Sequence, residues 1–512
     1  MLTKVYGSAV FGVEATKITV EVNIDKGVGY HLVGLPDNAI KESNYRIAAA
    51  LINNDYKIPG KKITINMAPA DMRKEGSAYD LTLAVGILAA SGQIKDDKIG
   101  KYLIMGELSL DGGLQPIKGA LPIAIQAKND GFTGFILPLQ NAKEAAIVSD
   151  LDVYGIENIM QAIEFFDKDK VLEPTIIDTK KEFYKNLDNP EFDFADVKGQ
   201  ETIKRCMEIA AAGGHNIILI GPPGSGKTML AKRLPSILPP MTLEEALETT
   251  KIHSVVGRLK ENSGLMSQRP FRSPHHTISD VALVGGGSYP QPGEISLSHN
   301  GVLFLDELPE FKRTVLEVMR QPLEDREVTI SRARFTVTYP SSFMLVASMN
   351  PSPSGYFNDP DSPMTSSPAE MQRYLGKVSG PLLDRIDIHI EVTPVPFEKL
   401  SDDRRGELSK DIRKRVIKAR DFQTKRFEKS EKVHYNAQMG VQQIRKYCKL
   451  SDESMNLLKN AMEKLNLSAR AYDRILKVSR TIADLEHKND IQSHHISEAI
   501  QYRSLDRDGW LG

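Results

Sequence analysis

The segment Gly221-Pro-Pro-Gly-Ser-Gly-Lys-Thr228 constrains the fold more than any other, because it directly follows the apolar run Asn216–Ile220. Such an order predicts a buried strand that leads through a phosphate-binding loop into a helix. Its glycines let the backbone aim N–H groups at phosphate oxygens, and the helix adds its positive dipole end. We expect the lysine to reach the β- and γ-phosphates and the threonine to bind Mg²⁺. The predicted nucleotide-binding residues are Gly221, Pro222, Pro223, Gly224, Ser225, Gly226, Lys227 and Thr228.

Two later segments predict hydrolysis as well as binding. The apolar run Gly301–Leu305 ends in the adjacent carboxylates Asp306 and Glu307, which is a Walker B pattern. The first carboxylate is expected to hold Mg²⁺ through water, and the second to polarise the attacking water. Another apolar run, residues 342–348, delivers Asn350 to the same edge of a parallel sheet. We expect Asn350 to sense the γ-phosphate, although an asparagine before a proline is also an ordinary turn residue.

The composition excludes several classes of protein. At 512 residues, 41% hydrophobic and 26% charged, the chain is too long for one core. A net charge of -1 excludes a globally basic nucleic-acid binder, so any such contact must come from local patches. Cys206 and Cys448 lie far apart without partners at metal spacing, which fits a reducing compartment. The longest apolar run, Leu81–Ala90, is too short to cross a bilayer and no signal peptide is evident, so we expect a cytoplasmic protein without membrane contact.

A polar, charge-rich stretch divides the chain, and the patterns on its two sides differ. We predict an α+β domain over residues 1–165, a linker over 166–193, a doubly wound nucleotide-binding α/β domain over 194–396 and a helical domain over 397–512. The predicted strands are Ile18–Asn23 and Lys62–Asn66; the predicted helices are Asp80–Ala90, Pro122–Asn129, Asp402–Phe427, Ser451–Leu465, Ala469–His487 and Gln492–Arg503, with caps at Ser451 and Ser493.

Taken in order, these motifs resemble those of the AAA+ ATPases, and within them the magnesium-chelatase-like group that includes the bacterial ComM (YifB) family. The resemblance spans nearly the whole chain. It implies an α/β AAA+ P-loop core with a helical C-terminal lid, ATP as the nucleotide and Mg²⁺ as its metal ion. The segments that carry it are Gly221–Thr228, Arg269–Thr277, Gly301–Phe311, Asn350–Pro351, Ser379–His389 and Leu467–Arg474.

The resemblance assigns roles to two arginines. Arg385 corresponds to the arginine finger that acts on the ATP of a neighbouring subunit, and Arg470 to the second sensor on the lid. A guanidinium supplies fixed positive charge where phosphoryl transfer develops negative charge. Arg474 lies four residues further on the same helical face and is an alternative sensor. Each arginine could instead pair with a nearby acid such as Asp384 or Asp473. A finger acting between subunits implies an oligomer, and the family resemblance suggests a homo-hexamer.

DNA contact is expected from segments inserted into the ATPase core. One insertion covers about residues 269–299, and a β-hairpin covers Glu327–Tyr339. Arg332 and Arg334 at its turn could track phosphates in a central pore, a contact that weakens steeply with salt. The alternative is a solvated hairpin that packs between subunits. His275 and His276 lack a third ligand at metal spacing, which favours hydrogen bonding or packing.

One segment departs from the family pattern. Many relatives carry a cysteine cluster, resembling a zinc site, between the first sensor and the arginine finger. The corresponding positions here are Ser352, Ser354, Met364 and Ser366. None is a thiolate, so we expect no zinc there.

The N-terminal domain resembles the proteolytic domain of Lon-type proteases (the ribosomal protein S5 domain 2-like fold), in residues 74–81 and 106–119. Lon-type enzymes use a serine–lysine dyad. Here Ala78 stands at the place of the serine and Leu121 at that of the lysine, while Ser77 and Lys118 are displaced by a few positions. We therefore expect a non-proteolytic domain.

The favoured hypothesis is a ring-forming ATPase of the ComM type. The resemblance implies a DNA helicase or translocase that acts on single-stranded or branched DNA and promotes branch migration in the recombination of incoming or homologous DNA, as in natural transformation. Recombination proteins are its expected partners. The alternative is a magnesium-chelatase-type motor subunit that remodels a protein partner. An ATP-dependent protease is disfavoured because the dyad is missing.

Overall fold

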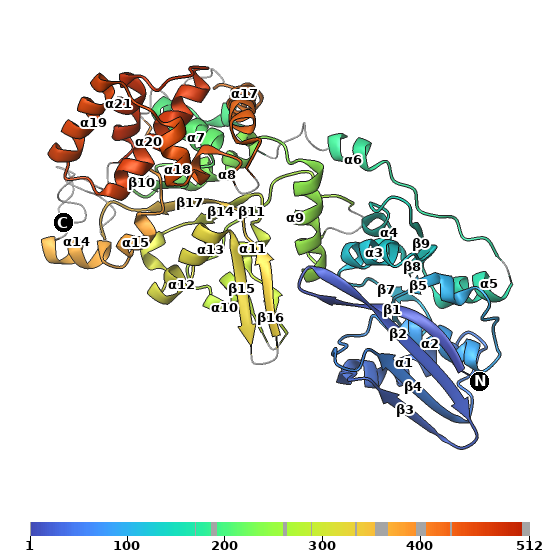
Figure 1. The fold of residues 1–512 in the computed structure, drawn as a ribbon. Helices are drawn as coiled ribbons and strands as arrows, with labels where there is room; N and C mark the ends of the chain where they lie inside the picture. The colour runs from blue at the N-terminus through green and yellow to red at the C-terminus, as the bar shows by residue number, and fades with distance from the viewer. Residues whose placement is uncertain are drawn as a thin grey trace. The chain divides into compact units, whose positions relative to one another are not determined.

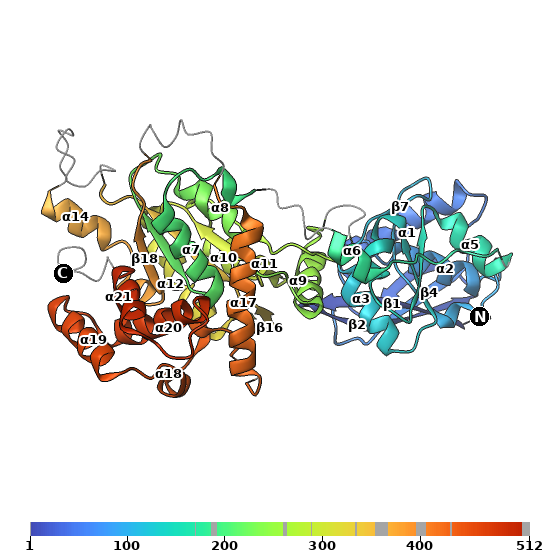
Figure 2. The ribbon, with the colours of Figure 1, turned by 90° about the horizontal axis from the view of Figure 1, so that it is seen from above.

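The computed structural model describes residues 2–168, 170–185, 192–259, 264–287, 289–332, 335–353, 367–395, 406–430 and 433–503. The chain forms two compact units (Figures 1 and 2). Unit 1 contains residues 1–186 and 242–267, and unit 2 contains residues 187–241 and 268–512. The chain therefore passes from one unit to the other after residues 186, 241 and 267, so neither unit is continuous in sequence.

Unit 1 is built on a mixed sheet of seven strands in the order β3-β4-β2-β1-β5-β8-β9 (Figure 1). β1 and β2 form an antiparallel hairpin that turns at Gly12, where φ is 65° and glycine carries no steric penalty. From Ile18 to Ile24, residues of β2 alternate between buried and partly exposed, as expected of a strand packed on one face. The strands are β1 (Leu2–Phe11), β2 (Glu14–Asp25), β3 (Gly29–Val33), β4 (Lys62–Ala68), β5 (Tyr102–Ile104), β8 (Gly134–Pro138) and β9 (Asp152–Ile156).

Helices complete the core of unit 1. Every residue of α2 (Asp80–Ala90) is buried, which explains an apolar run without a polar face. Among the residues that the structure describes, no helix is both long and apolar enough to cross a membrane. The other helices are α1 (Asn38–Ile52), α3 (Ala120–Asn129), α4 (Leu139–Ala145), α5 (Ile159–Asp167), α6 (Thr179–Lys185) and α9 (Leu243–Val256), with a second, two-stranded sheet of β6 (Glu107–Leu108) and β7 (Leu114–Gln115).

Helix α9 belongs to unit 1, although it lies in sequence between two elements of unit 2. Its Ser254 accepts a hydrogen bond from the backbone N–H of Gly119 (3.0 Å), just before α3, and donates its hydroxyl to the buried carboxylate of Glu144. Glu144 Oε1 also accepts the backbone N–H of Leu121 at 2.9 Å. Burial raises the pKa of Glu144 although these hydrogen bonds oppose the rise. Buried polar contacts of this kind fix α9 to α3 and α4.

Unit 2 contains a parallel five-stranded sheet in the order β11-β14-β17-β10-β18. Its inner strands read as continuous apolar runs because both faces are covered by other elements. The strands are β10 (Ile217–Ile220), β11 (Phe271–Arg272), β14 (Val302–Leu305), β17 (Met344–Met349) and β18 (Ile388–Glu391). This arrangement confirms the predicted α/β class.

Unit 2 also contains helices and two hairpins that form separate two-stranded sheets. The longer hairpin, β15 (Glu327–Arg332) with β16 (Phe335–Pro340), reaches out from the body of the unit (Figure 1). The shorter one pairs β12 (Gly285–Gly286) with β13 (Gln291–Pro292). The helices are α7 (Glu201–Gly213), α8 (Lys227–Ile237), α10 (Asp280–Val284), α11 (Glu294–Leu297), α12 (Arg313–Glu317), α13 (Arg320–Asp325), α14 (Pro368–Leu375), α15 (Gly380–Leu383), α17 (Ser409–Phe427), α18 (Val441–Tyr447), α19 (Asp452–Lys464), α20 (Ala469–Leu485) and α21 (Ser493–Gln501).

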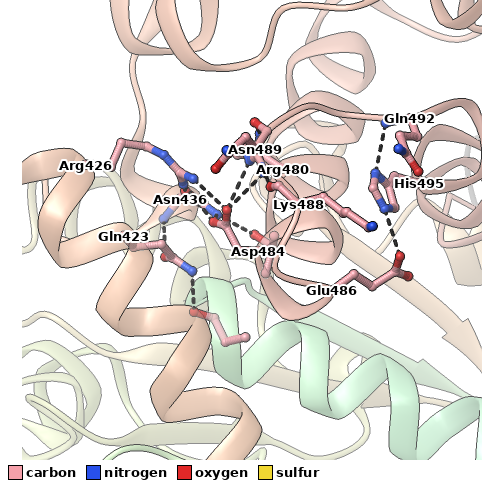
Figure 3. A network of polar contacts seen from close by, with 12 residues as sticks. Gln423, Arg426, Asn436, Arg480, Asp484, Glu486, Lys488, Asn489, Gln492 and His495 are labelled. Carbon is pink, nitrogen blue, oxygen red and sulfur yellow. Dashed lines mark hydrogen bonds and ion pairs between the residues drawn. The ribbon is translucent and has the colours of Figure 1, made fainter.

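A buried ion-pair network holds the C-terminal helices together (Figure 3). Its centre is Asp484 on α20, whose two oxygens accept hydrogen bonds from Arg426 on α17 at 2.6 and 2.7 Å. Asn436 and Arg480 complete the shell at 2.8 and 3.1 Å. A buried carboxylate is tolerated when its charge is paired and its lone pairs are satisfied, as they are here. The network therefore fixes α17 to α20.

Several predicted boundaries differ from the structure. The predicted linker contains the short helix α6. The predicted cap of the last helix is wrong, because α21 begins after Gln492, which forms a capping box with His495; Ser493 is already inside the helix. α17 begins at Ser409 rather than at residue 402, and residues 396–405 lie outside the described part. The membership of α9 in unit 1 was not predicted, and the predicted domain limits stay predictions.

Candidate nucleotide-binding site

Three neighbouring strands of unit 2 deliver the predicted nucleotide-binding residues to one edge of the sheet. β10 leads into Gly221, β14 into Asp306 and β17 into Asn350. Because β14, β17 and β10 are adjacent and parallel, their carboxyl ends meet, and the backbone N–H of Gly221 donates to Met349 O at 3.1 Å. In open parallel sheets this edge is where ligands bind.

The loop between β10 and α8 has the backbone that the glycines predict. Gly224 and Gly226 have φ values of 77° and 91°, in the left-handed region that other residues adopt only with strain. A side chain at Gly221 would approach Val392 O to 2.3 Å, so this glycine is required by close packing. Ser225 Oγ is buried and makes no hydrogen bond within the described residues. The loop thus offers an unpaired hydroxyl beside the start of α8.

Lys227 carries a buried charge without a carboxylate partner among the described residues. Its Nζ donates to Gly221 O (2.6 Å), Pro222 O (2.9 Å) and Asn350 Oδ1 (3.3 Å). Burial lowers the pKa of Lys227, while Asp306 and Glu307 act in the opposite direction. A buried ammonium that is hydrogen-bonded only by neutral oxygens fits an anionic ligand, which would supply the missing negative charge.

Thr228 and Asp306 meet beside this lysine. Thr228 Oγ1 donates to Asp306 Oδ2 at 2.8 Å, and Ser348 Oγ on β17 donates to the other oxygen of the same carboxylate. Hard oxygen donors of this kind suit Mg²⁺. Ser348 was missed by sequence reasoning, because a serine inside an apolar strand carries no motif. The signal available was its position one residue before the end of the strand that leads to Asn350.

Glu307 follows Asp306 in a left-handed backbone conformation, with φ of 55°. Its backbone N–H donates to Ser348 Oγ at 3.3 Å, and its side chain is 55% exposed. The carboxylate lies 3.5 Å from Nδ1 of His276, measured to Oε2. The structure therefore places His276 beside the predicted Walker B segment, and its ring packs on that of His275 with centroids 4.1 Å apart and ring planes at 34°.

The predicted arginine finger lies at the opposite edge of the sheet. The backbone carbonyl of Arg385 accepts Nδ2 of Asn216, the residue before β10, at 3.0 Å. The phosphate-binding loop follows the other end of β10, and four residues of strand span about 13 Å. The guanidinium of Arg385 donates to Pro381 O at 2.5 Å and to the carboxylate of Glu324. Arg385 thus pairs with an acid of its own chain, away from its own phosphate-binding loop.

Both candidate second sensors lie at this same amino-terminal edge. Arg470 is 67% exposed and contacts Asp384, the residue before Arg385. Asp384 is one of the acids that the alternative hypothesis offers as a partner for these arginines. Arg474 is 24% exposed and lies 3.0 Å from the buried Asp387. Arg470 is therefore the more available of the two for a ligand outside the chain, while Arg474 belongs to the core.

Asp387 and His215 form a buried pair that sequence reasoning missed. Through Thr481 this pair connects the amino-terminal edge of the sheet to helix α20 of the lid. Asp387 Oδ2 is 2.9 Å from Nδ1 of His215, whose Nε2 is 2.8 Å from Thr481 Oγ1 on α20. Burial alone would raise the pKa of Asp387, but Arg474, His215 and Lys477 together hold it well below its usual range. Burial lowers the pKa of His215. We conclude that an ionised Asp387 accepts a hydrogen bond from the Nδ1–H of a neutral imidazole.

The predicted DNA-contacting residues are only partly described. Arg332 ends β15 and is exposed, and its guanidinium lies near Gly286 of the shorter hairpin, where an added Cβ would be 3.1 Å from it. Arg334 lies outside the described residues.

The predicted metal-free loop is also described only at its start. Ser352 is buried, while Ser354, Met364 and Ser366 lie outside the described residues.

Elsewhere in the described residues, one group has ligand atoms close enough for a metal ion, namely Glu486, His494 and His495. Nδ1 of His495 accepts the backbone N–H of Gln492 at 2.9 Å, so Nε2 carries the proton and faces Glu486 at 3.1 Å (Figure 3). A metal ligand would need Nε2 deprotonated and Nδ1 protonated, which this cap opposes.

In unit 1 the Lon-like residues do not meet. Ser77 Oγ donates to the carboxylate of Glu107. The side chain of Lys118 lies beside Gly257, just after α9. Leu121, at the place of the Lon lysine, is fully buried and its N–H is bound by Glu144. Within the described residues Ser77 and Lys118 form no hydrogen bond with each other.

Comparison with known proteins gives matches along nearly the whole chain. Residues 193–400 match the family "Magnesium chelatase, subunit ChlI", residues 20–141 match "Subunit ChlI of Mg-chelatase", and residues 406–503 match its C-terminal part. The chain is 45% identical over 509 residues to "Competence protein ComM" of Haemophilus influenzae, covering 99% of this chain and 98% of that one. It is 44% identical over 510 residues to "Uncharacterized protein YifB" of Salmonella typhimurium, with the same coverage. "Lon protease 2" of Bacillus subtilis is 31% identical over 157 residues, 28% of this chain and 27% of that protein.

Proposed function

Because the chain belongs to the ComM/YifB family of magnesium-chelatase-like AAA+ proteins, we propose that it is a ring-forming ATPase that moves along DNA and drives branch migration. Membership of this family supports an ATPase and suggests the use of ATP and Mg²⁺. The observation that carries the proposal is the convergence of Lys227, Thr228, Asp306 and Asn350 at one sheet edge.

The roles follow from the chemistry of the side chains. The buried ammonium of Lys227 binds phosphate oxygens in place of Asn350 and the loop carbonyls, and Asn350 then orients the terminal phosphate. Thr228 and Asp306 provide oxygens for Mg²⁺, which would neutralise charge on the transferred group. Glu307, exposed and next to this cluster, accepts the proton of the attacking water.

The position of the arginines supports a site shared between subunits. Arg385 and Arg470 lie at the edge of the sheet opposite the phosphate-binding loop, each paired with an acid of its own chain. In a closed ring, that edge of one chain faces the loop of the next, and both guanidinium groups reach its γ-phosphate. The isolated chain is then a poor ATPase, and assembly, which we expect to be hexameric, completes the site.

The DNA part of the proposal rests on the hairpin and on the relative. Arg332 is exposed at the end of β15, on a hairpin that extends from unit 2. A ring of such arginines would contact phosphates without reading sequence. The name of the relative from Haemophilus influenzae, a competence protein, fits work on incoming DNA, where recombination proteins are the expected partners.

The test is ATP-dependent branch migration of a synthetic labelled junction by the purified protein. We expect the wild type to resolve the junction and Lys227→Ala to leave it intact. ATP hydrolysis that DNA neither stimulates nor couples to junction movement would contradict a DNA motor. It would favour the alternative, a motor that remodels a protein partner, which the matches to the ChlI subunit support.

A further inference from the structure

The side chain of Glu307 forms one ion pair among the described residues, with the imidazole of His276. The distance from Nδ1 to Oε2 is 3.5 Å, within ion-pair range and slightly longer than a good hydrogen bond. Asp306, by contrast, is held on both oxygens, by Thr228 and Ser348. The orientation of the Glu307 carboxylate, which must face the attacking water, thus depends on its contact with His276.

Strand register explains why these two residues meet. β11 lies beside β14 in parallel, with Phe271 opposite Val302 and Arg272 opposite Leu303. His276 is four residues beyond Arg272, and Glu307 is four residues beyond Leu303. Both segments leave the sheet at the same edge, so equal distances along the chain bring the imidazole and the carboxylate together.

The ring of His276 is fixed by its surroundings rather than by Glu307. It stacks on His275, whose own Nδ1 is 2.9 Å from Thr277 Oγ1, and its edge meets Phe311, with centroids 6.4 Å apart. The start of the loop is anchored by a two-point ion pair from Arg272 to Glu294, at 2.6 and 2.8 Å. An imidazole held by its neighbours therefore faces a half-exposed carboxylate.

We propose that His276 is a positioning residue for Glu307. It restricts the carboxylate to the orientation in which it accepts the proton of the attacking water, and it takes no part in nucleotide binding. This inference rests on the proposed ATPase function. A side chain with several rotatable bonds loses freedom when it is held, and a group held in advance reacts faster.

The test compares steady-state ATP hydrolysis by full-length variants at saturating DNA. His276→Phe keeps the aromatic packing but removes the donor, and we expect kcat to fall about five-fold with KM for ATP unchanged, the size expected for one exposed charged contact. His276→Asn, whose amide can donate from near the position of Nδ1, should recover most of the loss. His275→Phe preserves the stacking and does not touch Glu307, so it should match the wild type.

A double-mutant cycle separates positioning from a general structural effect. In a Glu307→Gln background, adding His276→Phe should cause no further loss, because the group that it positions has already been changed. An equal five-fold loss in that background, or a raised KM with unchanged kcat, would overturn the proposal, as would a His276→Phe enzyme with wild-type kcat. If His276→Phe does not fold, His276→Leu provides the same comparison. A wild type without ATPase activity would instead refute the proposed function.

Discussion

Unit 2 brings the side chains of its motif together, whereas unit 1 keeps those of its Lon-like motif apart. In unit 2, Lys227 reaches Asn350 and Thr228 reaches Asp306, across three strands. In unit 1, Ser77 is bound by Glu107, and Lys118 lies beside the end of α9. Both units keep the fold that their motifs indicate. A displacement of one to three residues therefore leaves the fold in place, while Ser77 and Lys118 each lie against other residues.

The largest effect is expected at Arg385, because the proposed site of unit 2 is completed by a second subunit. We expect Arg385→Ala to lower kcat about a thousand-fold, the size found when an arginine finger is removed. Mixing Arg385→Ala with Lys227→Ala subunits should restore part of the ATPase activity, because a Lys227→Ala neighbour still supplies its arginine. Absence of any recovery in mixed rings, or full activity of Arg385→Ala alone, would contradict a shared site.

A substitution at Lys227 tests whether the residues that converge at this sheet edge bind the nucleotide. Lys227→Ala should reduce ATP turnover at least about a hundred-fold, because it removes a preorganised positive charge from the site. The matched control is Lys232→Ala, an exposed lysine on the same helix, which should behave like the wild type. The measurement is ATP turnover together with binding of a fluorescent ATP analogue. If Lys227→Ala turned over ATP as fast as the control, the assignment of Lys227 to nucleotide binding would be wrong.

Ser348 tests the residue that the sequence motifs did not reveal. Ser348→Ala removes the hydroxyl that holds one oxygen of Asp306, and we expect the apparent affinity for Mg²⁺ to fall about ten-fold or more. The assay is ATPase activity titrated with Mg²⁺. Excess Mg²⁺ should restore most of kcat, which separates a weakened metal site from a misfolded protein.

Unit 1 has its own sensitive contact at Glu144. Ser254→Ala should destabilise unit 1 by about 1–3 kcal/mol, because the hydroxyl bound to Glu144 is lost in a buried place. Chemical denaturation of the full chain measures this loss.

The pH dependence of Glu144 gives a second test. Its pKa is higher in the folded than in the unfolded chain, so its contribution to stability is greatest below about pH 4.5 and is lost as the pH rises. Glu144→Gln keeps an acceptor for Leu121, and it should lose this part of the pH dependence. The comparison of wild type and variant melting temperatures between pH 5 and pH 8 checks the sign. A wild type that gains stability relative to Glu144→Gln as the pH rises would show the opposite shift.

The smallest effect is expected at Ser77. Ser77→Ala should leave casein intact, as the wild type should, because Ser77 hydrogen-bonds to a carboxylate rather than to a lysine. Degradation of casein that disappears in this variant would reverse the interpretation of unit 1.

Much of the fold could be predicted because its signals are local. The run Ile217–Ile220 before the glycine-rich loop, and the run ending at Asp306, place two strands of the sheet without knowledge of the rest. Helices α2 and α19 lie within one or two residues of the predicted limits, since apolar periodicity and the cap at Ser451 are local features too. The predicted cap of α21 was wrong because Gln492 and His495 form an unusual capping box that no simple sequence pattern indicates.

The parts that could not be predicted depend on contacts between distant segments. Ser348 and His276 contact residues more than thirty positions away. The membership of α9 in unit 1 depends on contacts with α3 and with Glu144, more than a hundred residues earlier. Pairings over such separations leave no periodicity in the chain, so only the folded structure reveals them.

The sequence by itself determined the class of fold, the identity of the phosphate-binding loop and the chemistry available there. These follow from residue types at fixed spacing, which act through the backbone of a few neighbouring residues. Only the tertiary structure decided that Arg385 and Arg470 lie at the edge away from their own loop, and which partner holds each buried charge. The physical reason is that strand order and register set distances between remote residues, and a charge is stabilised by whichever partner those distances bring near.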